Sequence, residues 1–497
     1  MKRFMKRFMR GLAIVFGVIL GLIVIFLTIE RYRGKFALAR YKKELTAKGA
    51  NLDWRTGFPT PSADDVKKTR EFFDAASTIT DVNASVCSIE TAWSKDLQLG
   101  ERRVVWKLPN PNVDGSVTWE QLEREMEANR AGRERILRVL ETPPLLMSHA
   151  PVTLVYSGGV FMKKRQVAQH FLGVVLLDLN KGRTEPALKD LHSYAELTRI
   201  HREDSDLPGF IIREAQMGMG CGILWQACQF QGWTDPQLAV MQADFGKRDA
   251  FADLISAFAL GRVSTVEVYD FVRHHDVRSV MMRELVEGQE PPGWGWDLLH
   301  KWEYYVFPFW KYAWADQDEL HALVLSQEVL DLLHSFSTNP SWKGIDVSLQ
   351  QQIADEKKQM RGGLFIPYNR CRYLCFGAGG YDQRSALGRV VQRVMENETM
   401  REMAVAAIAL KRYQLRHQAL PSKLDALVPE IMTQVPMDFM DGQPLRYRVN
   451  ADGSFTLYSV GLDGVDDGGS TQPPQKGYQS YIRGWDGRDM VWPVPAK

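Results

Sequence analysis

Hydrophobic and polar positions divide the chain into one long apolar run, a long helical stretch and a short segment of alternating residues. The apolar run from Gly11 to Ile29 contains nineteen residues and no charged side chain. At about 1.5 Å per residue, it nearly spans a hydrocarbon core about 30 Å thick. The charged residues Glu30, Arg31 and Arg33 follow directly, where a cleaved signal peptide would carry small residues. We therefore predict an uncleaved transmembrane helix, with residues 1–29 forming a cytoplasmic tail and anchor.

Helical spacing dominates residues 30–380. Gly49 is predicted to end the helix that continues the anchor, and Pro208-Gly209 is predicted to break the helical pattern before the helix that begins at Phe210. Thr118 with Gln121 three positions later is a capping-box pattern, which predicts that a helix begins there and continues to about Glu141. Between residues 160 and 287, apolar residues recur at the spacing of one helix face. Lys181-Gly182-Arg183 separates two of these runs, and the pair resembles one tetratricopeptide hairpin, although the period of about 34 residues does not recur. We predict a body of irregular helical hairpins.

The pattern changes near the C-terminus. Residues 383–418 read as one long helix, or as two helices that meet near Asn397, and Leu420-Pro421 ends this stretch. Residues 445–449 and 454–460 then alternate as strands, and the turn residues Asn450 to Gly453 join them as a hairpin. We predict a small α+β module over residues 381–497. The expected fold class is mainly α, with one N-terminal transmembrane helix and this module.

Charge and cysteine content exclude some classes of protein. The 497 residues include 62 Lys and Arg against 60 Asp and Glu, so no excess of positive charge points to nucleic acid. Five cysteines are too few and odd in number for a disulfide framework. Cys221 and Cys228 suit two thiols on one face of a buried helix, whereas a local disulfide between Cys371 and Cys375 stays open.

No sequence motif for catalysis is found. The nucleophile elbow, the phosphate loop, the His-Glu-x-x-His zinc motif and the dinucleotide fingerprint are all missing from the sequence. His274-His275-Asp276 is the most ligand-like cluster, but adjacent side chains on a helix point about 100° apart and do not readily share a metal ion. We predict a protein that is not an enzyme; an enzyme with an unrecognised site is the least favoured alternative.

An aromatic segment extends from Trp294 to Trp314, where ten of twenty-one residues are Phe, Tyr or Trp. One interpretation is a loop packed onto the helical body. The other is an aromatic surface at the membrane interface, where Trp and Tyr bury a ring and keep a polar group in water. A pocket lined by these rings would bind a ligand. The candidate ligand or interface residues are Trp294, Trp296, Trp302, Trp310 and Trp314.

The C-terminal module resembles the globular part of the major pseudopilin of type II secretion systems. The residues that carry the resemblance are Leu420-Pro421, Pro436-Met437-Asp438, Gly442 to Tyr447, Tyr458 to Gly464 and Asp489-Met490-Val491-Trp492. It covers residues 400–495. The rest of the chain resembles membrane-anchored, mostly helical bacterial proteins that end in such a module. The apolar helix lacks the glutamate that pseudopilins carry near its start, so the resemblance implies the fold of the module rather than assembly into a pilus.

The pseudopilin resemblance implies a calcium-binding loop. Carried over by position, Asp463 and Asp489 would be side-chain ligands and Val460 would supply its carbonyl oxygen. Asp466 or Asp467 would add further oxygens, because calcium takes six to eight of them. The alternative is an ordinary cluster of Asp-Gly turns without a metal ion. Calcium is the one cofactor that we predict.

These observations together favour a membrane-anchored scaffold or interaction protein. Basic residues flank both ends of the apolar run, but a short basic N-terminus usually stays in the cytoplasm. We therefore expect a single-pass protein of the bacterial inner membrane whose body lies outside the cytoplasm and binds protein partners of the cell envelope, in connection with type II secretion-like machinery. A ligand-binding or sensing protein that uses the aromatic segment is the alternative. The sequence does not indicate an oligomeric state.

Overall fold

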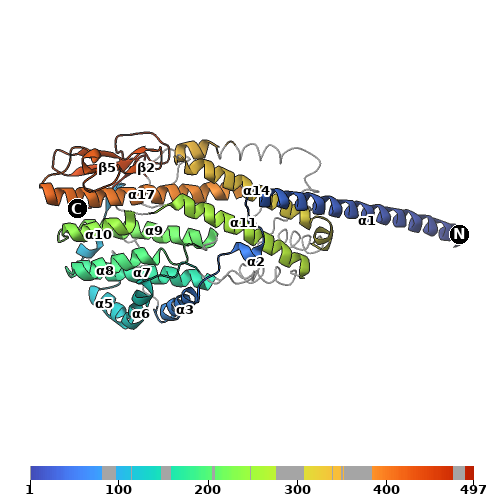
Figure 1. Ribbon diagram of the computed structural model, residues 1–497, viewed down its shortest axis with the longest axis horizontal. Coiled ribbons are helices and arrows are strands. Elements are labelled where there is room, and N and C mark those ends of the chain that lie inside the picture. Colours follow the sequence, from blue (N-terminus) through green and yellow to red (C-terminus); the bar gives the residue numbers. More distant parts are fainter. Residues whose placement is uncertain are drawn as a thin grey trace.

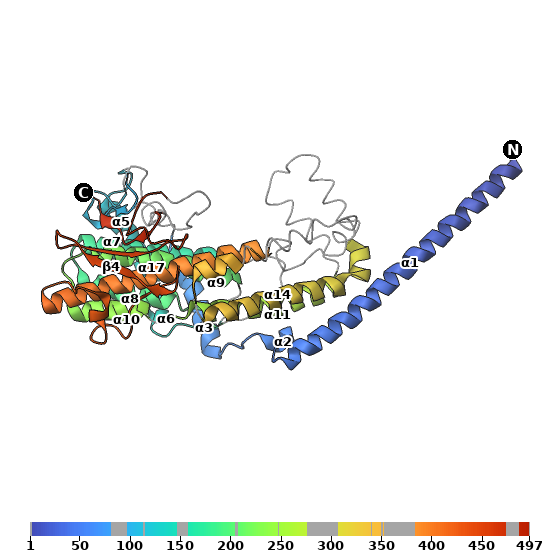
Figure 2. The same ribbon diagram turned by 90° about the horizontal axis from the view of Figure 1, so that it is seen from above.

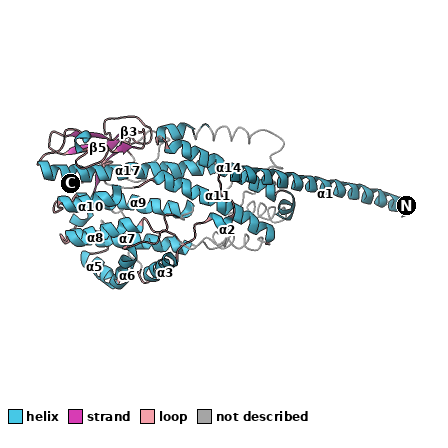
Figure 3. Cartoon of the chain, in the orientation of Figure 1, coloured by secondary structure: helices cyan, strands magenta, loops and turns pink. Residues whose placement is uncertain are grey.

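The computed structural model describes residues 2–80, 97–112, 115–146, 158–203, 207–246, 248–275, 307–338, 340–348, 351, 383–473 and 487–496. This part of the chain is mostly helical, and its few strands lie together near the C-terminus (Figure 3). Trp294, Trp296, Trp302 and the cysteines at 87, 371 and 375 lie outside the described residues.

The first helix, α1 (Lys2–Ala47), extends from one end of the body, and the C-terminus lies at the other end (Figure 1). The predicted anchor and the residues that follow it form this one continuous helix. Gly49 follows its end with a positive φ of 89°, as predicted. Within the described residues, α1 is the helix that is long and apolar enough to cross a membrane. Its 46 residues measure about 69 Å at 1.5 Å per residue.

The body consists of stacked layers of helices (Figure 1). The outer layer contains α3 (Ala63–Ser77), α5 (Trp119–Ala128) and α6 (Arg130–Leu140). It packs on the pair α7 (Gly158–Asn180) and α8 (Thr184–Leu197). Next come α9 (Leu207–Cys228) and α10 (Asp235–Gly246), which are covered by the 35-residue helix α17 (Gln383–His417). These layers surround the main hydrophobic core.

A second unit connects the body to α1. Helices α11 (Ala250–His274) and α14 (Ala315–Ser337) pack along each other, and α14 also packs against α1 (Figure 2). The short helix α2 (Trp54–Gly57) contacts α11. This arrangement places α1 beside a helix pair rather than at the end of a free linker.

Local sequence signals set many helix boundaries. The capping box of Thr118 and Gln121 is present as predicted, and Ser62 and Asp65 form another. The prediction of one helix over 118–141 is wrong, because α5 ends and α6 begins at Asn129. The Asn129 side-chain oxygen accepts a hydrogen bond from the Thr80 backbone N–H at 3.0 Å, a distant contact that the local pattern does not reveal.

A predicted helix break is also wrong. Pro208-Gly209 does not precede α9 but lies in its first turn, a position where proline is tolerated because its missing N–H has no helical partner there. Residues 383–417 form one helix, which decides between the two alternatives left open for this stretch. Cys221 and Cys228 on α9 are free thiols, as their spacing predicts.

The predicted hairpin is confirmed, and the sheet around it is larger than expected. Strand β4 (Arg446–Val449) pairs antiparallel with β5 (Phe455–Ser459), which also pairs with β6 (Met490–Val491). A small ribbon joins β2 (Met437–Asp438) to β3 (Gln443–Pro444), just after the 3-10 turn η4 (Leu424–Leu427). Strand β1 (Glu101–Arg102) of the body pairs parallel with β7 (Val494–Pro495).

The C-terminal strands and the helical body share one core. Trp225 of α9, Ile408 of α17 and Leu457 of β5 belong to the same cluster of buried side chains. The indole N–H of Trp225 donates to the Pro493 carbonyl at 2.9 Å, which ties the C-terminal tail to α9. The predicted division at residue 380 remains a prediction, but residues 383–473 pack as part of the body rather than apart from it.

We expect the fold to lose stability in mild acid because of His170, which is buried on α7. Burial, assisted by the nearby positive charge of Arg133, lowers the pKa of His170 to about 3, whereas an ordinary histidine has a pKa of about 6.5. Below about pH 6.5 the unfolded chain therefore binds a proton that the folded chain excludes. This one residue lowers the free energy of unfolding by about 2 kcal/mol at pH 5.

The variant His170→Leu removes this effect. Between pH 7.5 and pH 5, we expect its free energy of unfolding to fall about 2 kcal/mol less than that of the wild type. Urea titrations of the full chain in detergent measure the difference, and His274→Gln, whose side chain is 68% exposed, is the control. Identical pH dependence in His170→Leu and the wild type would contradict the assignment.

Candidate functional site

The contacts of α1 with α11 and α14, called here the anchor–body junction, begin at the end of the apolar run. The Gln317 amide of α14 donates to the backbone carbonyl of Glu30 at 2.8 Å and to its carboxylate at 2.9 Å. At Gly34 the two helices approach so closely that an added Cβ would lie 2.6 Å from Cγ of Gln317. Glycine therefore allows α1 and α14 to touch at this level.

Buried charges and apolar residues continue the junction along α1. The buried carboxylate of Glu319 pairs with Lys42 of α1 at 2.5 Å and also with Arg273 of α11. Leu38 and Leu45 of α1 lie in one hydrophobic cluster with residues of α11 and α14. α1 is therefore fixed to the body over several turns beyond the apolar run.

The described part of the aromatic segment also lies at this junction. Residues 307–313 are helical. Trp310 and Trp314 are buried with Tyr269 and Val272 of α11, and the Trp310 indole donates to Asp318 at 3.2 Å. For these two tryptophans the structure shows the packed arrangement, because burial against α11 removes their rings from any exposed surface.

Two neighbouring aromatic residues are exposed instead. Phe309 and Tyr312 have 54% and 45% of their surface exposed. The Tyr312 hydroxyl lies 3.5 Å from Thr28 Oγ1, and the Arg31 guanidinium lies 4.7 Å from the centre of the Tyr312 ring. The exposed Tyr312 ring therefore lies beside the end of the apolar run.

The predicted calcium ligands lie outside the strands, after β5 or directly before β6, where they bind protein groups. Asp489 is buried, and its Oδ2 accepts backbone N–H groups of Gly469 at 2.7 Å and Ser470 at 2.8 Å. Asp463 accepts the N–H of Val465 within its own turn at 3.0 Å. Among the residues that the structure describes, no three His, Cys, Asp or Glu side chains are close enough to hold one metal ion.

The other candidates in this loop are also in contact with protein groups. Asp466 accepts the hydroxyl of Tyr458 at 3.1 Å, and Asp467 lies 3.6 Å from the Arg488 guanidinium. The N–H of Val460 donates to Asp438 at 3.0 Å.

Burial raises the pKa of Asp438 to about 6, although three hydrogen bonds favour its ionised form. From the sequence, Asp463 was assigned to the candidate site and Asp438 was not, although Asp438 joins the β2 ribbon to β5.

Calcium binding remains a prediction, and Asp489 gives it a direct test. We expect Asp489→Ala to lower the melting temperature of the full chain with and without calcium, because the variant leaves the N–H groups of Gly469 and Ser470 without their acceptor. Scanning fluorimetry in calcium and in chelator measures both effects. A rise in melting temperature with calcium that Asp463→Ala abolishes would establish a metal site instead.

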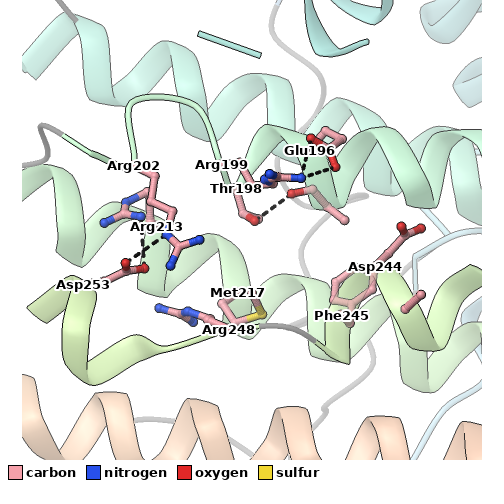
Figure 4. Close-up of a pocket in the computed structure, with 12 residues that line it drawn as sticks. Glu196, Thr198, Arg199, Arg202, Arg213, Met217, Asp244, Phe245, Arg248 and Asp253 are labelled. Carbon is pink, nitrogen blue, oxygen red and sulfur yellow. Dashed lines mark hydrogen bonds and ion pairs between the residues drawn. The ribbon is translucent and has the colours of Figure 1, made fainter. Parts of the chain in front are cut away.

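A polar pocket of about 230 Å³ lies between α8, α9, α10 and the start of α11. Arginine side chains from separate elements enter it: Arg199 and Arg202 follow α8, Arg213 lies on α9, and Arg248 lies between α10 and α11 (Figure 4). Met217 and Phe245 supply apolar surface. Arg202 and Arg213 share the carboxylate of Asp253, at 2.9 Å and 3.4 Å.

A buried ion network lies behind the pocket. Arg248 pairs with Glu214 of α9 and, at 3.2 Å, with Glu398 of α17. Glu398 also accepts Arg401 Nε at 2.9 Å. The amide of Asn397 donates to the Glu214 carboxylate at 3.0 Å. This network connects α17 to α9 and to the pocket wall.

Sequence reasoning missed these residues, although one signal was present. The 22 residues of α9 are apolar or neutral except for Arg213 and Glu214. Adjacent opposite charges inside an apolar helix indicate buried partners, because an unpaired buried charge is costly. Their partners come from other elements and could not be named from the sequence.

Comparisons with known proteins found no matching family model, no similar curated protein and no similar solved structure. The resemblances to a pseudopilin and to a tetratricopeptide hairpin therefore remain predictions that rest on the residues quoted for them.

Proposed function

We propose that the protein is a membrane-anchored scaffold of the bacterial inner membrane that presents its body to protein partners of the cell envelope. One observation carries the proposal: α1 contains the apolar run and is also packed into the body. A body fixed to its membrane helix keeps a defined orientation to the bilayer. Such an arrangement suits a protein that positions partners.

The exposed aromatic residues support the membrane location. Tyr312 lies beside Thr28 and Arg31, at the end of the apolar run, and Phe309 on the same short helix is also exposed. Trp and Tyr are enriched at membrane interfaces because each buries a ring and keeps a polar group in water. In the proposed arrangement the Tyr312 ring contacts the headgroup region, and the β strands lie far from the bilayer (Figure 1).

The proposed connection with type II secretion-like machinery is supported by the residues shared with the pseudopilin. The hairpin of β4 and β5 and the preceding helix α17 have the order that the resemblance implies. Deleting the gene is expected to reduce export of a type II substrate. Unchanged export would remove this part of the proposal.

Membrane topology tests the anchor and the location of the body. Alkaline phosphatase fused after residue 497 is expected to be active, whereas a green fluorescent protein fused at the same position is expected to be dark. The full chain should remain in the membrane after an alkaline wash. A cytoplasmic C-terminus, or release by the wash, would overturn the proposal.

A further inference from the structure

We infer that the pocket between α8, α9, α10 and α11 binds a small molecule that carries a phosphate group. Arg213 is the central observation. Its side chain is 5% exposed, and its Nη1 pairs with Asp253 at 3.4 Å. Its Nε and Nη2 donate to no acceptor in the part of the chain that the structure describes.

Those two nitrogens form one edge of the guanidinium. An arginine donates two parallel hydrogen bonds from this edge to a carboxylate or a phosphate. A buried cation with unmatched donors is costly, so an acceptor at this edge would stabilise the folded protein. Burial lowers the pKa of Arg213 to about 10, which leaves it charged at neutral pH.

The charges around Arg213 favour an anion. Arg202 and Arg213 share one carboxylate, Asp253, so these three side chains have a net positive charge. Of the other two acids that line the pocket, Glu196 pairs with Arg199 at 3.0 Å, and Asp244 lies 3.0 Å from His192, a ring that is charged only when protonated. Arg202 and Arg213 therefore carry one positive charge more than Asp253 balances.

The placement of the arginines favours a tetrahedral anion over a planar one. Arg202 and Arg213 enter from different elements (Figure 4), whereas Arg248 beside them is already paired with Glu214 and Glu398. A phosphate group offers oxygens in several directions, whereas a carboxylate offers one plane. A water molecule takes about 30 Å³ in the liquid, so a pocket of about 230 Å³ has room for a phosphate and a small organic part next to Met217 and Phe245.

The test uses the full chain in detergent with inorganic phosphate as the probe. At equal ionic strength, phosphate is expected to raise the melting temperature by about 2 to 4 °C over chloride, because a ligand of the folded state stabilises it. The same measurement in acetate tests whether a carboxylate stabilises the protein as much as phosphate does. Equal melting temperatures in phosphate and chloride, or an equal rise in acetate, would overturn the inference.

Arg213→Lys separates binding from folding. Lysine keeps a positive charge beside Asp253 but lacks the two-nitrogen edge, so phosphate affinity is expected to fall at least about tenfold while the protein folds. Arg130→Lys, at a side chain that is 59% exposed on α6, is the matched control and should keep wild-type affinity. An unchanged phosphate response in Arg213→Lys would place the anion elsewhere and refute the site.

Discussion

Replacing Glu398 by alanine is expected to lower the free energy of unfolding by about 3 to 5 kcal/mol. The Glu398 side chain is 2% exposed and bridges Arg248 at 3.2 Å and Arg401 at 2.9 Å. Removing it leaves two buried guanidiniums without their shared carboxylate. Glu214 and Glu402 still contact these arginines, so we expect a value near the lower end of the range.

An exposed ion pair provides the matched control for Glu398→Ala. Glu127 lies 3.2 Å from Arg130, and both side chains are more than half exposed. Glu127→Ala should cost less than about 1 kcal/mol, because solvent screens exposed pairs. Urea titrations of both variants in detergent measure the difference. Similar small effects would show that the buried network contributes little to stability.

Replacing Trp310 by alanine is expected to cost about 3 to 5 kcal/mol, the usual range for a large buried aromatic residue. Trp310 is fully buried, and its ring lies 5.5 Å from the Phe307 ring and 6.4 Å from the Tyr269 ring, measured between centres. The hydrophobic cluster around Trp310 also contacts Leu27 of α1. The variant should therefore loosen the anchor–body junction as well as the cluster.

Phe309→Ala is the control next to Trp310 in the sequence. Because the Phe309 ring is 54% exposed, its removal should change stability by less than about 0.5 kcal/mol. Limited proteolysis of the full chain in membranes measures the junction, and thermal unfolding measures stability. Equal sensitivity of the two variants would show that Trp310 is not part of the packed core.

The secondary structure was largely predictable because its signals act over a few residues. The Thr118 and Gln121 capping box, the glycine that ends α1 and the hairpin after Val449 each depend on neighbours in sequence. One error occurred where a distant residue decides. Asn129 separates α5 from α6 while accepting the N–H of Thr80, which is such a case. The break predicted at Pro208 had a local cause, because the first turn of α9 tolerates proline.

The pocket could not be predicted from the sequence. Arg213 stood out on an apolar helix, but Asp253 lies forty positions away, and Glu398, which pairs with Arg248, belongs to another helix. The aromatic segment shows the same limit. Its aromatic composition could be read from the sequence. Only the packing against α11 shows that Trp310 is buried and that Phe309 is exposed.

The sequence by itself determined the mostly helical character, the apolar run of α1 and the β4–β5 hairpin. Composition and periodicity encode these features within windows of a few to about twenty residues. Only the tertiary structure decided that β1 pairs with β7, that α1 packs on α14, and that arginines from separate elements meet at one pocket. Each of these depends on contacts between residues far apart in the chain. Such charged and apolar side chains come into contact only when the helices pack together.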